Sequence, residues 1–499
     1  MKKNIFKIFS IVGLSIALVL GSCESTLEID PRQSIDANIA LNTPEGLNAA
    51  INSVYARLRA LSTYGRDLLA VAEALADNGR VTGNSGRLIG ENNNLPLSHL
   101  NNWQNAYFAI NECNLILDGI NNVSPAPTQA TRDRWIGQIK FLRALYYFDL
   151  VRVWAYDPGV AVAAQDRGGV PISTTGIKTA TEALTFLPAR APVSEVYALI
   201  YADLQDAATL LPNTGAPQYA TSGAATALLS RVALYNKDYA TAVSAATTAL
   251  GSSVGAVLSG AAYQAGWRAA IHPESMFEVR FQVAAENIGV NESLQTSYTT
   301  IQQFSTIGNF AVVGGWGDLA PRLDFLPLLG ITVTGDGTNA INVTKGDDAR
   351  VSLYEVGPGR GSGRKVECIK FLGKTGTLNM DNVPVIRKSE MLLNRAEARA
   401  TPGSAVLDEV AALADLNTFR AARNLPPVAL TGTDLYEEIL LQRRLEFAFE
   451  GHRWFDLKRL GRNVVKGATV LEYTDFKILP RIPLSQVDGN PNMVQNFGY

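Results

Sequence analysis

The sequence predicts a mainly α-helical protein, built on a tetratricopeptide-like helical-repeat scaffold with an irregular insert that contains small β-hairpins. Two observations predict this class. Apolar residues recur every three or four positions through most of the chain, which is the period of a helix. Between about 252 and 385 this period gives way to glycine-rich turns and short alternating segments rich in threonine and valine, which are typical of strands and turns.

The first residues have the pattern of an export signal. Lys2, Lys3 and Lys7 give a positive start, and residues 8–20 form an apolar run that is shorter than the about 20 residues needed to span a bilayer. A basic start, a short apolar middle and small residues before a cut site describe a secretory signal peptide. We therefore expect residues 1–22 to be a signal peptide.

Cys23 ends the motif Leu20-Gly21-Ser22-Cys23, which resembles the lipobox of bacterial lipoproteins. In such proteins the cysteine sulfur receives a diacylglycerol, the peptide is cut before the cysteine, and the freed amine is acylated. Several acyl chains hold a protein firmly, because each buried CH₂ contributes about 0.8 kcal/mol. An ordinary secretory peptide with an incidental cysteine is the alternative. Since charge, length and motif agree, we expect Cys23 to be the lipid anchor.

Helical stripes dominate an N-terminal region that we place at residues 23–250. Trp103 and Cys113 lie on one apolar stripe, so we expect a core tryptophan and a buried thiol. The segment "RWIGQIKFLRALYYFDLVRVW" is apolar on most faces, which predicts a central helix. The periodicity predicts helices over residues 44–61, 103–120, 134–154, 193–211 and 223–250, the last range holding two.

The segment "AATALLSRVALYNKDYATAVSAATTAL" resembles a tetratricopeptide helix pair. Small residues stand at the crossing points, and Asn236-Lys237-Asp238 gives a short turn. Small side chains let two helices approach closely, which is how such repeats stack. One copy is clear, so the sequence indicates helical-repeat character rather than a regular array.

A C-terminal region, residues 251–499, holds the insert and returns to helix at its end. "RVSLYEVGPGRGSGRKVECIKFLG" predicts a β-hairpin around a Gly-Pro-Gly turn. Earlier in the chain, residues 77–98 break all periodicity and are heavy in Asn and Gly, which predicts a long exposed loop. Helices are predicted again over residues 387–400, 404–423 and 434–459.

Composition excludes some classes of function. The chain has 499 residues, 47% hydrophobic and 18% charged, which is typical of a globular body with a large core. A net charge of −2 and a pI of about 6.1 give no electrostatic case for nucleic acid. The three histidines show no metal-ligand spacing, and "GPGRGSG" lies between strands rather than before a helix, so it is not a phosphate loop. We expect no metal and no cofactor.

One pair of carboxylates has a spacing that could serve catalysis. Glu446 and Glu450 lie four residues apart on a predicted helix, a spacing that could suit a glycosidase. Arg443, Arg444 and Arg453 lie within three or four residues of them and can neutralise them. We therefore interpret the pair as part of a structural ion-pair network, and we expect no catalytic residue.

Several segments together resemble the SusD/RagB family of outer-membrane nutrient-uptake lipoproteins of Bacteroidetes. "NNWQNAYFAINECNLIL", "FLRALYYFDLVRVWA" with the following "GGVPI", "VIRKSEMLLNRAEA" and "LNTFRAARNLP" match its helices in order. "LLQRRLEFAFEGHRWFDLKRLG" and the closing "PRIPLSQVDGNPNMVQNFGY" are the most specific matches. The resemblance runs from Cys23 to Tyr499, with Phe497 standing where the family pattern has Pro.

The resemblance implies a right-handed helical-repeat scaffold, attached to the outer face of the outer membrane through the acylated Cys23. It also implies a lid-like role over a SusC-like, TonB-dependent β-barrel transporter, its partner. Such proteins capture glycans, or peptides in some branches, and they are not enzymes. Their ligand residues vary, so Cys23 is the functional residue that the motif match itself carries over.

Glycan binding needs exposed aromatic faces for the C–H surfaces of sugars and fixed polar groups for their hydroxyls. Trp316 is the best candidate platform, because glycines flank it and a turn would leave it partly exposed. The alternative is a loop tryptophan that folds back as a plug. Trp267 and Tyr298 are weaker platform candidates.

The Asn-rich loop could supply the polar groups. Asp77, Asn78, Arg80 and Arg87 all lie there. Asn and Gly also dominate loops simply because they tolerate turn geometry, so a purely structural role is the alternative.

We therefore expect a lipid-anchored binding protein that faces outward from the cell surface, captures oligo- or polysaccharide and passes it to its transporter. A peptide- or protein-capturing RagB-like lipoprotein is one alternative. A surface glycoside hydrolase is a second and weaker one.

Overall fold

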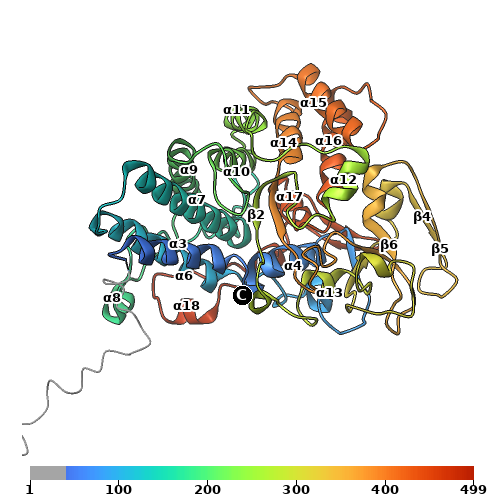
Figure 1. The fold of residues 1–499 in the computed structure, drawn as a ribbon, viewed down its shortest axis with the longest axis horizontal. Helices are drawn as coiled ribbons and strands as arrows, with labels where there is room; N and C mark the ends of the chain where they lie inside the picture. Colours follow the sequence, from blue (N-terminus) through green and yellow to red (C-terminus); the bar gives the residue numbers. More distant parts are fainter. Residues whose placement is uncertain (1–40) are drawn as a thin grey trace, which may run out of the picture.

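The computed structural model describes residues 41–499 (Figure 1). The expected signal peptide, residues 1–22, and the expected lipid anchor, Cys23, lie outside the described residues. The fold class is confirmed: the described chain is mostly helical, with strands that form two-stranded antiparallel pairs.

The N-terminal helices lie side by side in one half of the molecule (Figure 1). Each helix predicted there is present, and the central one is apolar around most of its circumference because neighbours cover it on several sides. The helices are α3 (Pro44–Arg57), α6 (Trp103–Gly119), α7 (Gln129–Trp154), α9 (Val193–Leu210), α10 (Ser222–Tyr235) and α11 (Tyr239–Leu250).

The helix pair α10 and α11 has the expected tetratricopeptide-like form. Lys237 adopts a left-handed φ of 60° in the turn, and the Asp238 side chain caps α11 by accepting from the Thr241 N–H at 3.1 Å. Ala233 and Ala242 pack together at the crossing with Ala398 from a later helix. Small side chains thus bring three helices close together, as the sequence predicted.

The C-terminal helices are α14 (Lys388–Ala400), α15 (Glu409–Ala422), α16 (Gly432–Glu446) and α17 (Arg453–Arg459). The prediction of one continuous helix over 434–459 is wrong. Phe449 and Gly451 take left-handed φ angles of 65° and 78°, which end the helical path. A Cβ at position 451 would lie 2.1 Å from the carbonyl oxygen of Leu68, so close packing on α4 (Asp67–Leu75) requires glycine there.

The insert carries short strand pairs, and the predicted hairpin is confirmed. β6 (Tyr354–Val356) pairs with β7 (Val366–Cys368) across the glycine-rich turn. The other antiparallel pairs are β1 (Gly79–Val81) with β3 (Leu319–Pro321), β2 (Ser275–Val279) with β8 (Val383–Arg387), β4 (Ile331–Thr334) with β5 (Asn342–Lys345), and β9 (Val464–Lys466) with β10 (Thr469–Leu471).

Short helices that the sequence analysis did not single out join these elements. Most have fewer than eight residues, too few for a periodic apolar stripe to stand out. They are α4, α5 (Ile89–Asn92), α8 (Ala180–Thr185), α12 (Gly260–Gly266), α13 (Leu294–Tyr298) and α18 (Leu484–Asp488).

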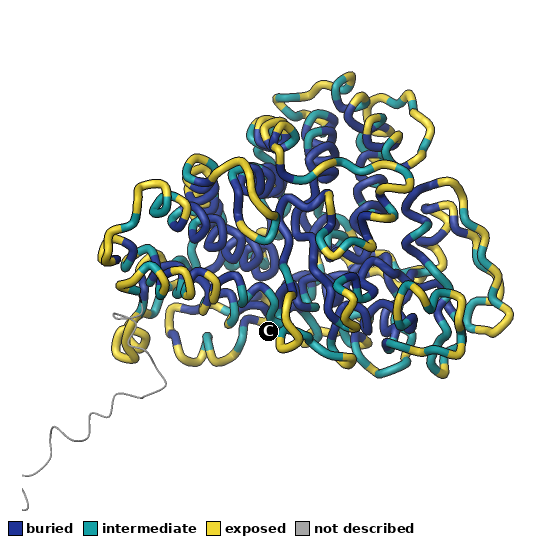
Figure 2. Tube along the Cα trace, viewed as in Figure 1, coloured by how far each residue is buried: buried dark blue, intermediate teal, exposed yellow. Residues whose placement is uncertain are grey.

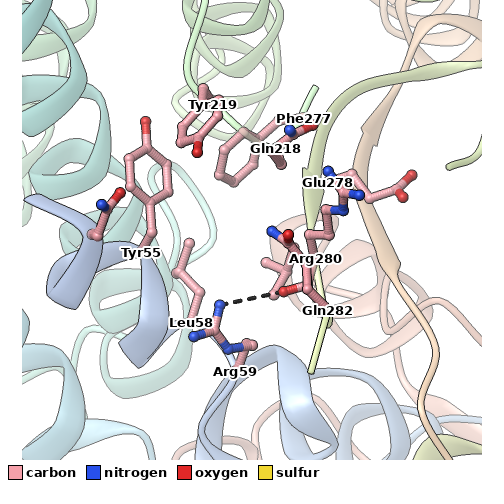
Figure 3. Close-up of a pocket in the computed structure, with 11 residues that line it drawn as sticks. Tyr55, Leu58, Arg59, Gln218, Tyr219, Phe277, Glu278, Arg280 and Gln282 are labelled. Atoms are coloured by element: carbon pink, nitrogen blue, oxygen red, sulfur yellow. Dashed lines mark hydrogen bonds between the residues drawn. The ribbon is translucent and has the colours of Figure 1, made fainter. Parts of the chain in front are cut away.

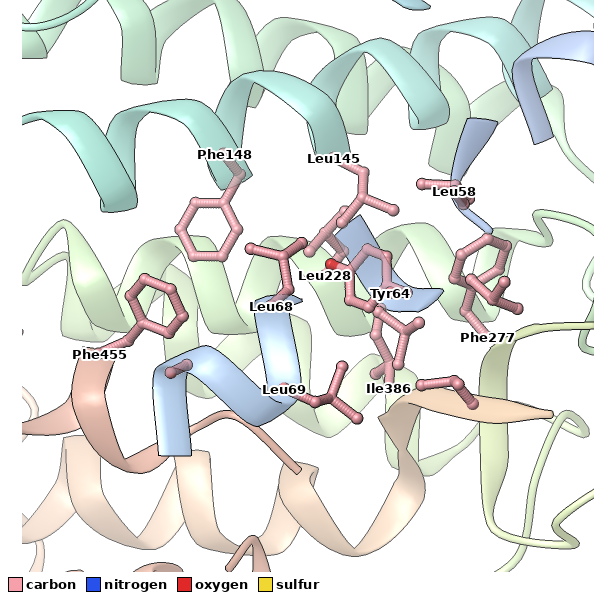
Figure 4. Close-up of a cluster of buried hydrophobic side chains, with 14 of the residues drawn as sticks. Leu58, Tyr64, Leu68, Leu69, Leu145, Phe148, Leu228, Phe277, Ile386 and Phe455 are labelled. Carbon is pink, nitrogen blue, oxygen red and sulfur yellow. The ribbon is translucent and has the colours of Figure 1, made fainter. Parts of the chain in front are cut away.

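The core joins the two halves of the chain (Figure 4). Leu145 and Phe148 of α7 face α4, the β2–β8 pair and α17 in one apolar cluster (Figure 4). Figure 2 shows that the buried stretches of the chain gather in the middle of the molecule. Trp103 is buried, as predicted, and Trp454 is buried too. Cys113 is free and buried, which confirms the predicted buried thiol, and Cys368 is free and buried as well. Among the described residues, no helix is both long and apolar enough to cross a membrane.

Residues 77–98 are not the exposed loop that their composition predicted. They begin with two buried residues, Asp77 and Asn78, and include β1 and α5. Segments from the far end of the chain hold them: Arg453 donates to Asp77 at 2.7 Å and Arg444 to Asn78 at 2.7 Å. The Tyr499 hydroxyl donates to the carbonyl of Pro96 at 2.7 Å.

Candidate functional site

Strand β1 leads into the first loop of the candidate site. Its antiparallel register sets Arg80 opposite Ala320, so the residues after β1 lie beside those before β3. The Thr82 N–H donates to the carbonyl of Asp318 at 2.9 Å, and its hydroxyl donates to the carbonyl of Gly317 at 2.7 Å. These bonds fix residues 82–87 against the segment that carries Trp316.

The segment that carries Trp316 is the second loop of the site, and the turn between β6 and β7 is the third. Gly363 has a φ of 75°, and a Cβ there would lie 1.9 Å from the carbonyl oxygen of Gly337, so only glycine fits. The tight path brings Arg360 to the Trp316 segment, where its Nε donates to the carbonyl of Gly315 at 2.7 Å.

Asn84 ties the three loops together. Its Nδ2 donates to the Trp316 carbonyl at 2.8 Å, and its Oδ1 accepts from the Ser362 hydroxyl at 2.6 Å. We call the meeting point of residues 82–87, 314–318 and 357–365 the Trp316 junction.

The Trp316 ring is partly exposed at this junction and lies among polar groups. The guanidinium carbon of Arg360 is 4.4 Å from the ring centroid and that of Arg87 is 5.8 Å away. The indole Nε1 donates to Asn291 Oδ1 at 3.3 Å. The ring is therefore partly open to solvent and partly covered by polar side chains, and cation–π attraction holds two arginines next to it.

Two carboxyl groups lie beneath the junction. Asp318 accepts from Arg87 Nε at 3.0 Å and from the Ser85 hydroxyl, and burial raises its pKa in spite of these donors. Burial also raises the pKa of Glu367 to about 7, although Thr299 and Thr300 donate to it at 2.6–2.8 Å. Both carboxyls point into the protein and are bonded there.

The other candidate polar residues lie in structural contacts. Arg80 donates to both oxygens of Asp336, at 2.8 and 2.7 Å. Asp77 is bonded to Arg453, and this partner holds its pKa below the usual value although burial opposes the shift. Of the four loop residues proposed from sequence, the structure brings Arg87 to Trp316, whereas Asp77 and Asn78 are buried.

Trp267 and Tyr298 are both fully buried. Each ring packs near Phe371, with centroids 6.1 Å from it. Neither ring has a face open to a sugar, so neither enters the function proposed below.

Local sequence patterns do not point to Arg360, Asn84 or Asn291. Arg360 stands in the glycine-rich segment that was considered as a phosphate loop, and an arginine between glycines was the available signal. Asn84 and Asn291 reach Trp316 from 232 and 25 residues away along the chain, and no local pattern reports such contacts.

Glu446 and Glu450 are confirmed as members of an ion-pair network, but with other partners than those expected. Arg387 donates to Glu446 at 2.7 Å and to Glu450 at 2.9 Å, while Arg423 donates to Glu446 at 2.8 Å. Burial alone would raise the pKa of Glu446, but Arg423 and Arg387 hold it well below its usual value. The neighbouring arginines turn elsewhere: Arg443 to Asp456, Arg444 to Asn78 and Arg453 to Asp77.

Hollows occur elsewhere on the described surface. One encloses about 230 Å³ and is lined by Tyr55, Arg59, Tyr219 and Arg280, with Arg59 donating to the Arg280 carbonyl at 3.3 Å (Figure 3). Tyr219 is 45% exposed and also lines an adjoining hollow of about 390 Å³. Trp316 lines neither hollow. The described residues hold no cluster of three or more His, Cys, Asp or Glu that could bind a metal ion.

Comparison with known proteins gives two family matches. Residues 27–234 match a family model described as "Starch-binding associating with outer membrane", and residues 369–499 match the model of the SusD family. Neither description names a catalytic activity.

Relatives and solved structures agree with these matches. The SusD-like protein P38 of Formosa agariphila is 25% identical, with both chains covered in full. A putative sugar binding protein of Bacteroides vulgatus has a crystal structure with a TM-score of 0.75 and 25% identity, covering 92% of this chain and 99% of that one. A laminarin binding SusD-like protein has a TM-score of 0.68 and 22% identity, covering 92% and 100%. With both matched segments, a full-length relative and the shared fold in agreement, the chain belongs to the SusD/RagB family.

Proposed function

We propose that this protein captures oligo- or polysaccharide at the cell surface and delivers it to a SusC-like, TonB-dependent transporter. The observation that carries the capture step is the Trp316 junction. It combines a partly exposed indole with fixed polar side chains from separate loops.

The chemistry of the junction suits a sugar. An indole offers an apolar surface to the C–H groups of a pyranose ring, and fixed donors and acceptors orient its hydroxyls. A guanidinium has five N–H donors, and Arg360 directs two of them to the carbonyls of Gly315 and Gly314. The remaining N–H groups have no partner among the described residues and can donate to a ligand.

Membership of the family supports the remaining steps. One matched family model is described as associating with the outer membrane, and Cys23 in its lipobox-like motif is the proposed anchor. We expect Cys23→Ala to move the protein from the membrane fraction to the released fraction. We expect the unaltered chain to co-purify with a β-barrel transporter. Recovery of the Cys23→Ala variant in the membrane at the unaltered level would contradict the anchor.

The capture step is tested with the purified full chain in native gels that contain starch, laminarin, polygalacturonate or carrageenan. We expect at least one glycan to retard the protein and Trp316→Ala to lower the affinity about 10-fold or more, since stacking and its polar contacts are lost together. Tyr219→Ala is the matched control, because it removes an exposed aromatic ring at a different hollow.

Reducing ends are assayed in the same samples. Retardation without new reducing ends, lost in Trp316→Ala and kept in Tyr219→Ala, supports capture at the junction. Loss in Tyr219→Ala alone would move the site to the hollow of Figure 3. New reducing ends would favour the hydrolase alternative. No retardation by any glycan, with retardation by a peptide mixture, would favour the peptide-capturing alternative.

A further inference from the structure

We propose that the Trp316 junction recognises glycans that carry negative charge, as uronate carboxylates or as sulfate esters. This inference rests on the proposed function and names the substrate class of that same site. Two cationic side chains of one loop, Arg360 and Arg364, carry it.

Arg360 lies at the centre of the junction without an acidic partner. Its bonds go to the carbonyls of Gly315 and Gly314, at 2.7 and 3.4 Å. No carboxylate of the described residues lies within ion-pair distance of it. A guanidinium stacked on an aromatic face keeps its in-plane N–H groups for bidentate bonds to planar or tetrahedral oxyanions. With its guanidinium carbon 4.4 Å from the Trp316 ring centroid and its Nε bonded to Gly315, Arg360 is held in place for such a bond.

Arg364 repeats the arrangement four residues later. Its guanidinium carbon is 3.8 Å from the ring centroid of Phe310, and its Nη1 donates to the carbonyl of Asn339 at 3.0 Å. Among the described residues it too has no carboxylate partner. Lys365 follows, but it is buried and its Nζ donates to the carbonyls of Ser362 and Gly363, so it serves the loop itself.

The acidic groups nearby are paired elsewhere and do not neutralise Arg360 or Arg364. Asp318 is paired with Arg87, and Asp336 is paired with Arg80. Glu367 is buried and bonded to Thr299 and Thr300 on the inner side. The loop therefore adds positive charge to this surface of a chain whose net charge is −2, and a local positive field attracts an anionic ligand.

The test uses the purified full chain and four probes. Carrageenan and chemically desulfated carrageenan differ in sulfate alone, polygalacturonate supplies carboxylates, and laminarin is neutral. Affinities are measured by titration calorimetry at 50 and 500 mM NaCl. We expect carrageenan or polygalacturonate to bind more tightly than the neutral probes and to weaken at the higher salt, because salt screens exposed charges.

Matched variants locate the effect. Arg360→Ala should lower the affinity for the charged probe about 10-fold and reduce its salt dependence. Arg364→Ala is a second variant in case the first one perturbs folding. Arg280→Ala removes the same charge at the hollow of Figure 3 and should change neither quantity.

Each other outcome overturns the inference. Equal binding of carrageenan and its desulfated form, still lost in Trp316→Ala, would overturn it and leave the proposed function standing. Equal losses in Arg360→Ala and Arg280→Ala would show diffuse attraction instead of a site. Binding of none of the four probes would count against the proposed function itself, and the inference would fall with it.

Discussion

Two tryptophans of this chain lie among positively charged side chains, one in the interior and one at the surface. The interior ring, Trp267, is fully buried, and three cations lie 5.0–5.4 Å from its centroid, namely Lys370, Lys374 and Arg387. The surface ring, Trp316, is partly exposed, and two cations lie over it, Arg360 at 4.4 Å and Arg87 at 5.8 Å.

The two sites differ in the groups to which their cations donate hydrogen bonds. Beside Trp267, Arg387 donates to three buried carboxylates, those of Glu274, Glu446 and Glu450. Beside Trp316, Arg360 donates to backbone carbonyls. Residue types are alike in both places, so an aromatic ring with an arginine is no sign of function by itself. A cation left without a counter-charge at the surface is the informative feature.

The largest effect expected from this comparison is on stability. Arg387→Met leaves Glu274, Glu446 and Glu450 short of a buried partner, which should lower the free energy of unfolding by about 3–5 kcal/mol. Arg360→Met removes the same group over an exposed ring and should change it by less than about 0.5 kcal/mol. Urea unfolding measures both values. Equal losses in the two variants would abolish the distinction between the sites.

The pH dependence of stability tests the carboxyl group of Glu367, which lies beneath the junction. Burial raises the pKa of Glu367 to about 7 in the folded state, above the about 4.3 of an unfolded chain. Its contribution to stability is therefore complete below about pH 4.3 and is lost as the pH rises through 7. We expect Glu367→Gln to destabilise the protein more at pH 5 than at pH 8, by about 2–3 kcal/mol. Urea unfolding at both pH values measures this, and a difference of opposite sign would refute it.

The interior should respond to pH in the opposite direction. Burial lowers the pKa of His99 to about 3, with a smaller contribution from Lys458. Its contribution to stability is complete above about pH 6.5 and is lost as the pH falls toward 3. The Leu100 N–H donates to His99 Nδ1 at 2.8 Å, so His99→Asn keeps an acceptor.

We expect the protein to lose about 2 kcal/mol of unfolding free energy through His99 between pH 7 and pH 5. The His99→Asn variant should lack that part of the loss. Parallel stability curves for the two proteins over this range would contradict the prediction.

The smallest effect expected is on the position of the Trp316 ring. Asn84→Ala removes two hydrogen bonds that join the loops, and each contributes about 1 kcal/mol. We expect glycan affinity to fall a few-fold and the free energy of unfolding to fall by no more than about 2 kcal/mol, the sum for the two bonds. Asn93→Ala, at an exposed position of the same segment, is the control. Unchanged affinity in Asn84→Ala would show that the ring needs no such support.

Local patterns in the sequence predict much of this fold. The six longest helices of the N-terminal half lie where the apolar periodicity places them, and the hairpin of β6 and β7 follows from its glycine-rich turn. The break between α16 and α17 could not be predicted, because it depends on the contact of Gly451 with Leu68, nearly four hundred residues earlier. Short-range periodicity carries no information on such a contact.

The candidate site likewise contains residues that local sequence predicts and residues that depend on distant partners. Trp316 was found because its flanking glycines indicate a turn, and Arg87 because it lies in a polar loop. Asp77 was assigned to that loop's surface, but Arg453 draws it into the interior from 376 residues away. Arg360 reaches the Trp316 segment from 45 residues away. Partners so distant in sequence decide whether a polar residue is structural or free to bind.

The bonds from the far end of the chain to residues 77–96 also constrain the order in which this protein can assemble. Asp77 and Asn78 can form their hydrogen bonds only with Arg453 and Arg444 in place, and the Pro96 carbonyl needs the Tyr499 hydroxyl. Residues 77–96 therefore cannot reach their final contacts before residues 444–499 have been synthesised. Contacts of such high sequence separation also slow folding. A chain without residues 444–499 would lack all three contacts, so these residues are needed to hold residues 77–96 in place.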